Sequence, residues 1–63
     1  MPTYNYIVEK HIGWWQSTNM FNSYEKALMF ATSRWEDTSP TKRRILRSEE
    51  GSGKPEVIVW ESE

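Results

Sequence analysis

The sequence predicts an α+β domain in which one helix packs on a mainly antiparallel four-stranded sheet, a two-layer ββαββ sandwich. Three observations predict it. Residues 4–10 alternate apolar and polar side chains, residues 24–35 repeat apolar side chains at helical spacing, and residues 56–60 include three consecutive β-branched residues. The chain has 63 residues, which is enough for one domain, residues 1–63, and too few for two.

A first hairpin is predicted from residues 4–10 and about 14–19. Tyr4, Tyr6 and Val8 fall on one face of the first strand, whereas Ile7 and polar neighbours fall on the other. Gly13 can take a positive φ without steric cost, which suits the connection. The returning strand has a less regular pattern because its second half is polar.

The helix is predicted over residues 23–36. Asn22 and Ser23 are both suitable N-caps, and with Asn22 as the cap Glu25 completes a capping box. Phe21 just before the cap is predicted to act as a hydrophobic staple. The apolar stripe consists of Tyr24, Ala27, Leu28, Ala31 and Trp35.

A second hairpin is predicted from residues 42–48 and 56–60, joined by the polar segment 49–55. Alternation places Ile58 and Trp60 on one side of the last strand, with Val57 and Val59 on the other. Trp35 and Trp60 are expected to be structural, at the core or its edge.

Apolar residues are predicted on both faces of this sheet, although one helix can cover only one of them. Strands that meet water on one face usually alternate cleanly, and these strands do not. Two interpretations remain open. A second copy of the domain covers the open face, because a two-fold dimer uses one patch twice, or the apolar residues are simply exposed, as on many surfaces.

Trp14 and Trp15 are candidate interaction residues, together with Ile7 on the open face. Neighbours on a strand point to opposite faces, so only one Trp can face the helix, and the other must lie on the open face, at the rim or in a partner. Exposed Trp is enriched at binding hot spots and can also stack on a nucleobase. The alternative is that both are partly buried.

The basic residues Lys42, Arg43, Arg44 and Arg47 are further candidates. On a strand Lys42 and Arg44 share one face and Arg43 and Arg47 the other, so they do not make one continuous surface. They could contact phosphates from a strand edge, or pair with glutamates across the second hairpin. The formal net charge of −1 does not favour a nucleic-acid or membrane protein.

Catalysis and metal binding have little support in the sequence. The chain has no cysteine and one histidine, His11, in a predicted turn. A nucleophile with an oriented base, a metal-ligand spacing and a glycine-rich phosphate loop are all missing. We therefore expect no enzyme activity, no cofactor and no metal. No apolar run approaches the ~20 residues that span a bilayer, so a cytoplasmic location is expected.

Three segments of the chain carry a resemblance. They are Gly13-Trp14 after the first strand, Phe21-x-Ser23-x-Glu25-x-Ala27 at the helix start, and a closing hairpin with a glycine-containing turn. In these the chain resembles small uncharacterised domains of bacteria and their phages. The resemblance implies the hairpin–helix–hairpin layout, and a host-cytoplasm location if phage-encoded. No site residue is carried over from it.

The function expected from the sequence is that of a small protein-binding or accessory module, with a protein partner or itself as a homodimer through the open sheet face. The alternative is a nucleic-acid-binding protein that uses the basic 42–47 strand and an exposed aromatic.

Overall fold

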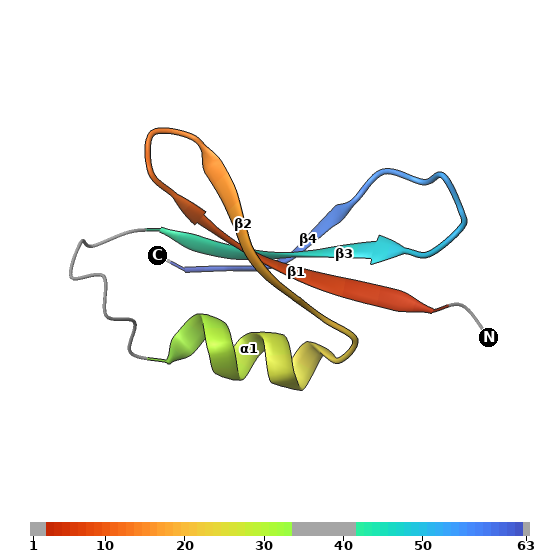
Figure 1. The fold of residues 1–63 in the computed structure, drawn as a ribbon, viewed down its shortest axis with the longest axis horizontal. Coiled ribbons are helices and arrows are strands. Elements are labelled where there is room, and N and C mark those ends of the chain that lie inside the picture. The colour runs from red at the N-terminus through yellow and green to blue at the C-terminus, as the bar shows by residue number, and fades with distance from the viewer. Residues whose placement is uncertain (1–2, 34–41, 63) are drawn as a thin grey trace.

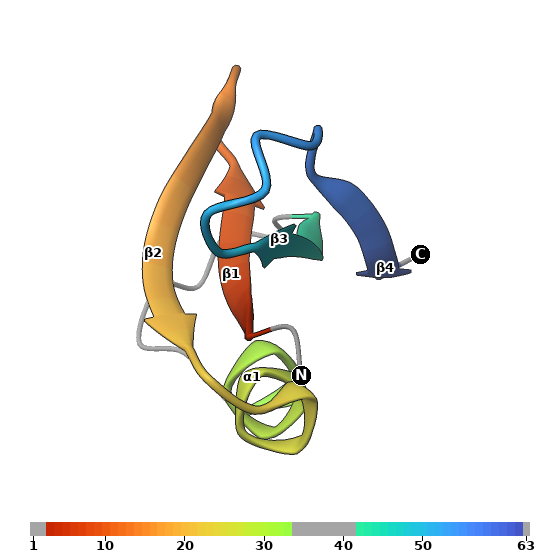
Figure 2. The same cartoon turned by 90° about the vertical axis from the view of Figure 1, so that its right-hand side faces the viewer.

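The computed structural model describes residues 3–33 and 42–62, and it confirms the ββαββ fold (Figure 1). The elements are β1 (Tyr4–His11), β2 (Trp15–Phe21), α1 (Tyr24–Thr32), β3 (Arg43–Glu49) and β4 (Val57–Glu61). The four strands form one antiparallel sheet in the order β2-β1-β3-β4. The helix packs on one face of this sheet (Figure 2). No helix within the described residues is long and apolar enough to cross a membrane.

The core lies between α1 and the two central strands. Val8 of β1 and Ile45 of β3 are directly paired and fully buried. Ala27 and Ala31 of α1 are buried against them, and their short side chains let the helix approach the sheet closely. Partly buried residues surround this centre: Tyr6, Phe21, Tyr24, Leu28, Phe30, Val59 and Trp60. The core is therefore small, with aromatic side chains forming much of its border.

The start of α1 differs from the prediction. Ser23 is the N-cap and makes no side-chain capping hydrogen bond, so the capping box with Asn22 as its cap is wrong. Phe21 is the last residue of β2, where it pairs with Tyr6, and its ring packs 5.5 Å from that of Phe30. Strand pairing therefore continues past the predicted end of β2 at residue 19, and the chain turns into the helix only after it.

The end of α1 is earlier than predicted. The helix ends at Thr32, whose hydroxyl donates to the Leu28 carbonyl at 2.8 Å, and the Ser33 hydroxyl donates to the Phe30 carbonyl at 2.6 Å. The Thr32 bond is a side-chain bond back to the carbonyl of residue i−4, whereas the Ser33 bond satisfies a carbonyl of the last turn, which also accepts the Ser33 N–H at 3.2 Å. Trp35, the last residue of the predicted stripe, lies outside the described residues.

Each edge strand carries a bulge next to the level of the central Val8–Ile45 pair. The register shifts opposite Val8/Glu9 in β2 and opposite Ile45/Leu46 in β4, which leaves Thr18 and Val59 as the extra residues. Bulges bend a strand and increase its twist. Both hairpin ends accordingly rise on the side of the sheet away from α1 (Figures 1 and 2).

The β4 bulge corrects one predicted side-chain direction. Trp60 pairs with Ile45 and packs on the core beneath the sheet, whereas Ile58 pairs with Leu46 on the other face. Simple alternation had placed Ile58 and Trp60 on the same side. The structural role predicted for Trp60 is nevertheless confirmed, since its ring is partly buried against the core.

Replacing Ile45 by Val should destabilise the domain by about 1 kcal/mol, because a methylene is lost from a fully buried site. In a domain of this size the loss corresponds to a fall in Tm of roughly 4–8 °C, measurable by circular dichroism. Ile58→Val is the matched control. Ile58 is 47% exposed, so the same change there should leave Tm almost unchanged at low protein concentration. Equal effects at the two positions would contradict the location of the core.

Candidate functional site

An apolar row crosses the sheet face that lies opposite α1. It contains one residue from each strand: Met20 of β2, Ile7 of β1, Leu46 of β3 and Ile58 of β4. Ile7 pairs with both Met20 and Leu46, and Leu46 pairs with Ile58, so the row is continuous. Ile7 and Leu46 point to this face because each is next to a core residue, Val8 or Ile45, in its strand. Met20 and Ile58 join them by cross-strand pairing.

The two ends of the apolar row are open to solvent. Met20 is 64% exposed and Ile58 is 47% exposed, whereas Leu46 at the centre is only 8% exposed. A shallow hollow lies at the β2 end, lined by Ile7, Ser17, Thr18, Asn19 and Met20. The Thr18 hydroxyl donates to the Val8 carbonyl at 2.9 Å, which holds the bulge at the edge of this hollow. The exposed apolar surface is thus concentrated on the edge strands.

A polar cluster borders the apolar row toward the β1–β2 turn. Glu9 is only 9% exposed, and its carboxylate accepts from Arg44 Nε at 2.8 Å and from the Ser17 hydroxyl at 3.1 Å. The Arg44 guanidinium lies over the Trp15 ring at 4.1 Å from its centroid. The His11 ring meets Trp15 edge to face at 5.1 Å. Stacking and hydrogen bonding together fix the Arg44 side chain on this face.

Trp14 and Trp15 do not lie on opposite faces of the sheet, although strand alternation had predicted this. Trp15 begins β2 and lies on the open face in the polar cluster, where it is partly buried. Trp14 precedes the strand, in the β1–β2 connection, and is 64% exposed. Neither residue faces α1, because β2 starts one residue later than predicted and the alternation argument applies only inside a strand. Trp14 is the more accessible of the two.

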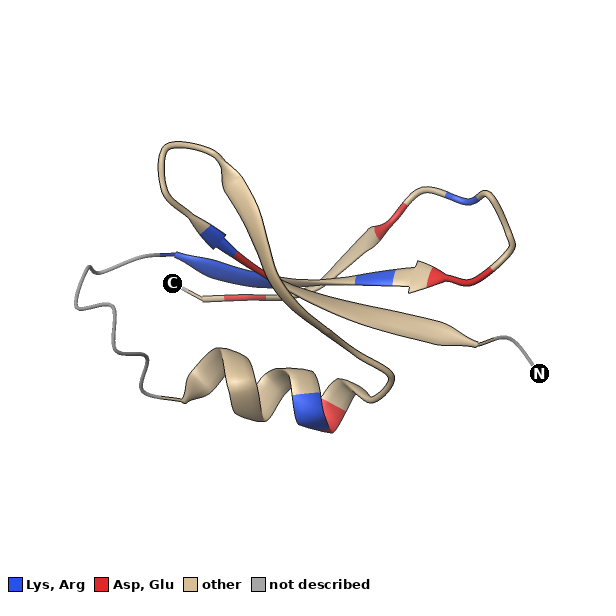
Figure 3. Ribbon diagram, viewed as in Figure 1, with Lys and Arg blue, Asp and Glu red and all other residues tan. Residues whose placement is uncertain are grey.

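Three of the basic residues near β3 are consecutive along the chain and the fourth lies further along the strand (Figure 3), but their side chains lie in separate places. Lys42 is exposed before the strand. Arg43 donates to the carbonyls of Ala31 and Ser33 at 2.6 and 2.9 Å, which ties β3 to the end of α1. Arg44 lies on the open face, whereas Arg47 is on the helix side, over the Tyr4 ring at 4.7 Å. The four cations therefore do not form one surface.

The cross-strand pairing expected for these arginines involves a different strand. Glutamates of the second hairpin were the predicted partners, but Arg44 pairs with Glu9 of β1. The reason is that β3 is a central strand with β1 on its other side. Within the second hairpin, Lys54 and Glu49 form an ion pair at 3.4 Å.

The described residues contain no group of three or more His, Cys, Asp or Glu side chains placed to hold a metal ion. His11 was predicted in a turn, but it is the last residue of β1, where it pairs with Trp15 of β2. Comparisons of the chain with protein families, curated proteins and solved structures find no match. The resemblance to small bacterial and phage domains therefore stays a prediction.

Sequence reasoning missed three members of the apolar row as site residues. Met20 was missed because the polar residues 16–19 precede it. The sequence therefore gave no reason to extend the strand beyond its predicted end at about residue 19. Leu46 and Ile58 were recognised as apolar, but the sequence did not assign them to the open face, and their alignment with Ile7 depends on the β1–β3 and β3–β4 registers. Only the pairing of strands distant in sequence makes these residues neighbours.

Replacing Arg44 by Met should destabilise the domain by about 1–3 kcal/mol, because the largely buried Glu9 carboxylate loses its charged partner. In the double variant Arg44→Met/Glu9→Gln, part of this loss should be recovered, with a coupling free energy of about 1 kcal/mol in urea unfolding. Lys54→Met is the control, since the Lys54 side chain is 73% exposed and its pairing with Glu49 should contribute little. Additive effects of the Arg44 and Glu9 changes would contradict the coupling.

Proposed function

We propose that this chain is a small protein-binding module of bacterial or phage origin that acts as an accessory protein and associates with itself through the open sheet face. The observation that supports the proposal is the apolar row of Met20, Ile7, Leu46 and Ile58. It crosses all four strands on a face that no described element covers. We propose binding rather than catalysis.

The layout of the open face resembles the anatomy of a protein interface. Interfaces have an apolar centre and a polar rim, with aromatic and Arg residues enriched. Here the apolar row is the centre, and the polar cluster with Trp15 and Arg44 lies along one side of it. Trp14, 64% exposed at the tip of the neighbouring hairpin, would add an aromatic contact at the rim.

The size of the face indicates how strong the association would be. Four strands spaced about 4.8 Å apart, with about seven residues rising about 3.3 Å each, give a face of roughly 19 by 23 Å. An interface of standard size buries about 800 Å² on each partner, about one sixth of the 4795 Å² that the chain exposes. The flat area falls below that standard, so we expect a reversible homodimer rather than an obligate one.

The alternative function, nucleic-acid binding through Lys42, Arg43, Arg44 and Arg47, has less support. The side chains of Arg43, Arg44 and Arg47 lie in different places. Arg43 is hydrogen-bonded to the end of the helix, and Arg44 is hydrogen-bonded to Glu9. A phosphate backbone would therefore meet no continuous basic surface.

Replacing Met20 by Asp should weaken the homodimer at least tenfold, because a charge would be buried without a partner at the apolar row. Analytical ultracentrifugation of the parent chain at concentrations up to about 1 mM should show a monomer–dimer equilibrium in the micromolar to millimolar range.

Met29→Asp is the matched control for the homodimer. Met29 is 72% exposed on α1, away from the open face, so the same substitution there should leave the equilibrium unchanged. A parent chain that stays monomeric at every concentration would contradict the homodimer. Equal weakening by the two aspartates would contradict the role of the open face.

A further inference from the structure

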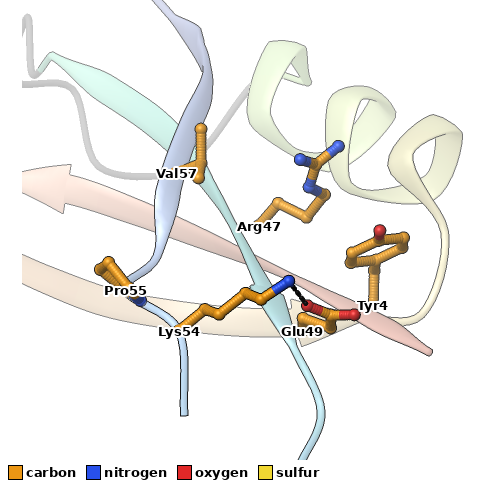
Figure 4. Close-up of a pocket in the computed structure, with 6 residues that line it drawn as sticks. All are labelled: Tyr4, Arg47, Glu49, Lys54, Pro55 and Val57. Carbon is orange, nitrogen blue, oxygen red and sulfur yellow. Dashed lines mark ion pairs between the residues drawn. The ribbon is translucent and has the colours of Figure 1, made fainter. Parts of the chain in front are cut away.

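A pocket of about 150 Å³ lies on the helix side of the sheet, opposite the apolar row (Figure 4). Strand pairing brings its walls together, because Tyr4 pairs with Glu49 and Arg47 pairs with Val57. The connection between β3 and β4 closes the remaining side. The lining residues are Tyr4, Arg47, Glu49, Lys54, Pro55 and Val57.

Arg47 lines this pocket with guanidinium N–H donors that are not used within the described part of the chain. Its guanidinium is held over the Tyr4 ring, 4.7 Å from the centroid. Among residues 3–33 and 42–62, no hydrogen bond or ion pair engages its N–H donors. A guanidinium has five such donors in a planar fork, and an aromatic face beneath it fixes its plane. Arg47 is thus oriented for a ligand without being neutralised by the protein.

The charges around the pocket favour a monoanion. Glu49 is the acidic residue of the lining, and its carboxylate is paired with Lys54 at 3.4 Å, as the dashed line in Figure 4 marks. With that pair balanced, the positive charge of Arg47 is the one without a counterion in the pocket. A dianion such as phosphate would bring a second negative charge next to Glu49 with nothing to compensate it.

The shape and the other walls favour an organic anion over an inorganic one. The Tyr4 ring, Pro55 and Val57 give an apolar border around the charged groups. One water molecule takes about 30 Å³ of liquid volume, so a cavity of about 150 Å³ admits a ligand of several heavy atoms.

From these observations we propose that the pocket binds the carboxylate of a small organic acid, with Arg47 as its main contact. The carboxylate accepts two parallel N–H bonds from the guanidinium, the geometry in which Arg recognises carboxylates most strongly. The aliphatic part of the acid contacts Tyr4, Pro55 and Val57. The proposal is independent of the homodimer, since the pocket and the apolar row are on opposite faces.

The proposal is tested by titrating the ¹⁵N-labelled chain with propionate and, in parallel, with propionamide, and following amide chemical shifts by NMR. Propionate should shift the resonances of the pocket residues with a millimolar dissociation constant, and propionamide, which lacks the charge, should not. Arg47→Gln should weaken propionate binding at least tenfold. Equal responses to the acid and the amide, or an unchanged affinity in Arg47→Gln, would overturn the proposal.

Two further variants keep the test decisive if Arg47→Gln does not fold. Glu49→Gln removes the negative charge from the pocket and should tighten propionate binding several-fold. Lys54→Met leaves Glu49 without its partner and should weaken binding several-fold. Opposite signs for these two changes support the site, and the absence of either effect contradicts it.

Lys42→Gln is the matched control for charge, because it removes the same single positive charge from an exposed position outside the pocket. It should leave the affinity for propionate unchanged. A loss equal to that of Arg47→Gln would show that binding follows net charge alone and would overturn the site. A parallel titration with inorganic phosphate at pH 7 should give weaker binding than propionate, and tighter phosphate binding would overturn the assignment to a carboxylate.

Discussion

The antiparallel pairing of β1 with β3 is the interaction on which the rest of the structure depends. These strands come from opposite halves of the chain, yet they form the centre of the sheet, and each carries one edge strand beside it. Their register places Val8 beside Ile45 under the helix and Ile7 beside Leu46 on the other face. A slip of one residue in one strand would send its apolar residues to the wrong face, so the core and the apolar row are fixed together.

The short length of α1 determines how much of the helix side of the sheet is covered, and it leaves the other side of the sheet open. Nine helical residues supply two buried alanines, so the helix covers the central strands but leaves much of the border to aromatic side chains. Leu46 is 8% exposed although no described element packs over it, which makes the centre of the open face almost as apolar and protected as a core. The bulges at Thr18 and Val59 bend both edge strands on either side of the Val8–Ile45 pair. The open face is therefore flanked by two raised hairpin ends.

The sequence predicted the features that depend on local periodicity and missed those that depend on pairing. The order of the elements and the helix stripe up to Ala31 follow from the spacing of apolar residues within single segments. The separation of Arg44 from Arg43 and Arg47 follows from strand alternation within one segment. That Ile58 and Trp60 lie on opposite faces could not be predicted, because an extra residue in one strand is visible only against its partner strand. The pairing of Arg44 with Glu9 requires knowing that β1 lies next to β3.

The three arginines of β3 show why proximity in sequence is a poor guide to a binding surface on a strand. Arg43 satisfies carbonyls at the end of α1, and Arg44 neutralises a largely buried carboxylate, so the charge of each is used by the fold itself. Arg47 is the member that has a ring to orient it and no acceptor among the described residues. The sequence cluster suggested a surface that binds a polyanion, but only the Arg47 guanidinium is left oriented in a pocket. A single guanidinium matches a single carboxylate better than it matches a nucleic-acid backbone. The near-neutral net charge of the chain agrees with this, since it provides no long-range field to attract a polyanion.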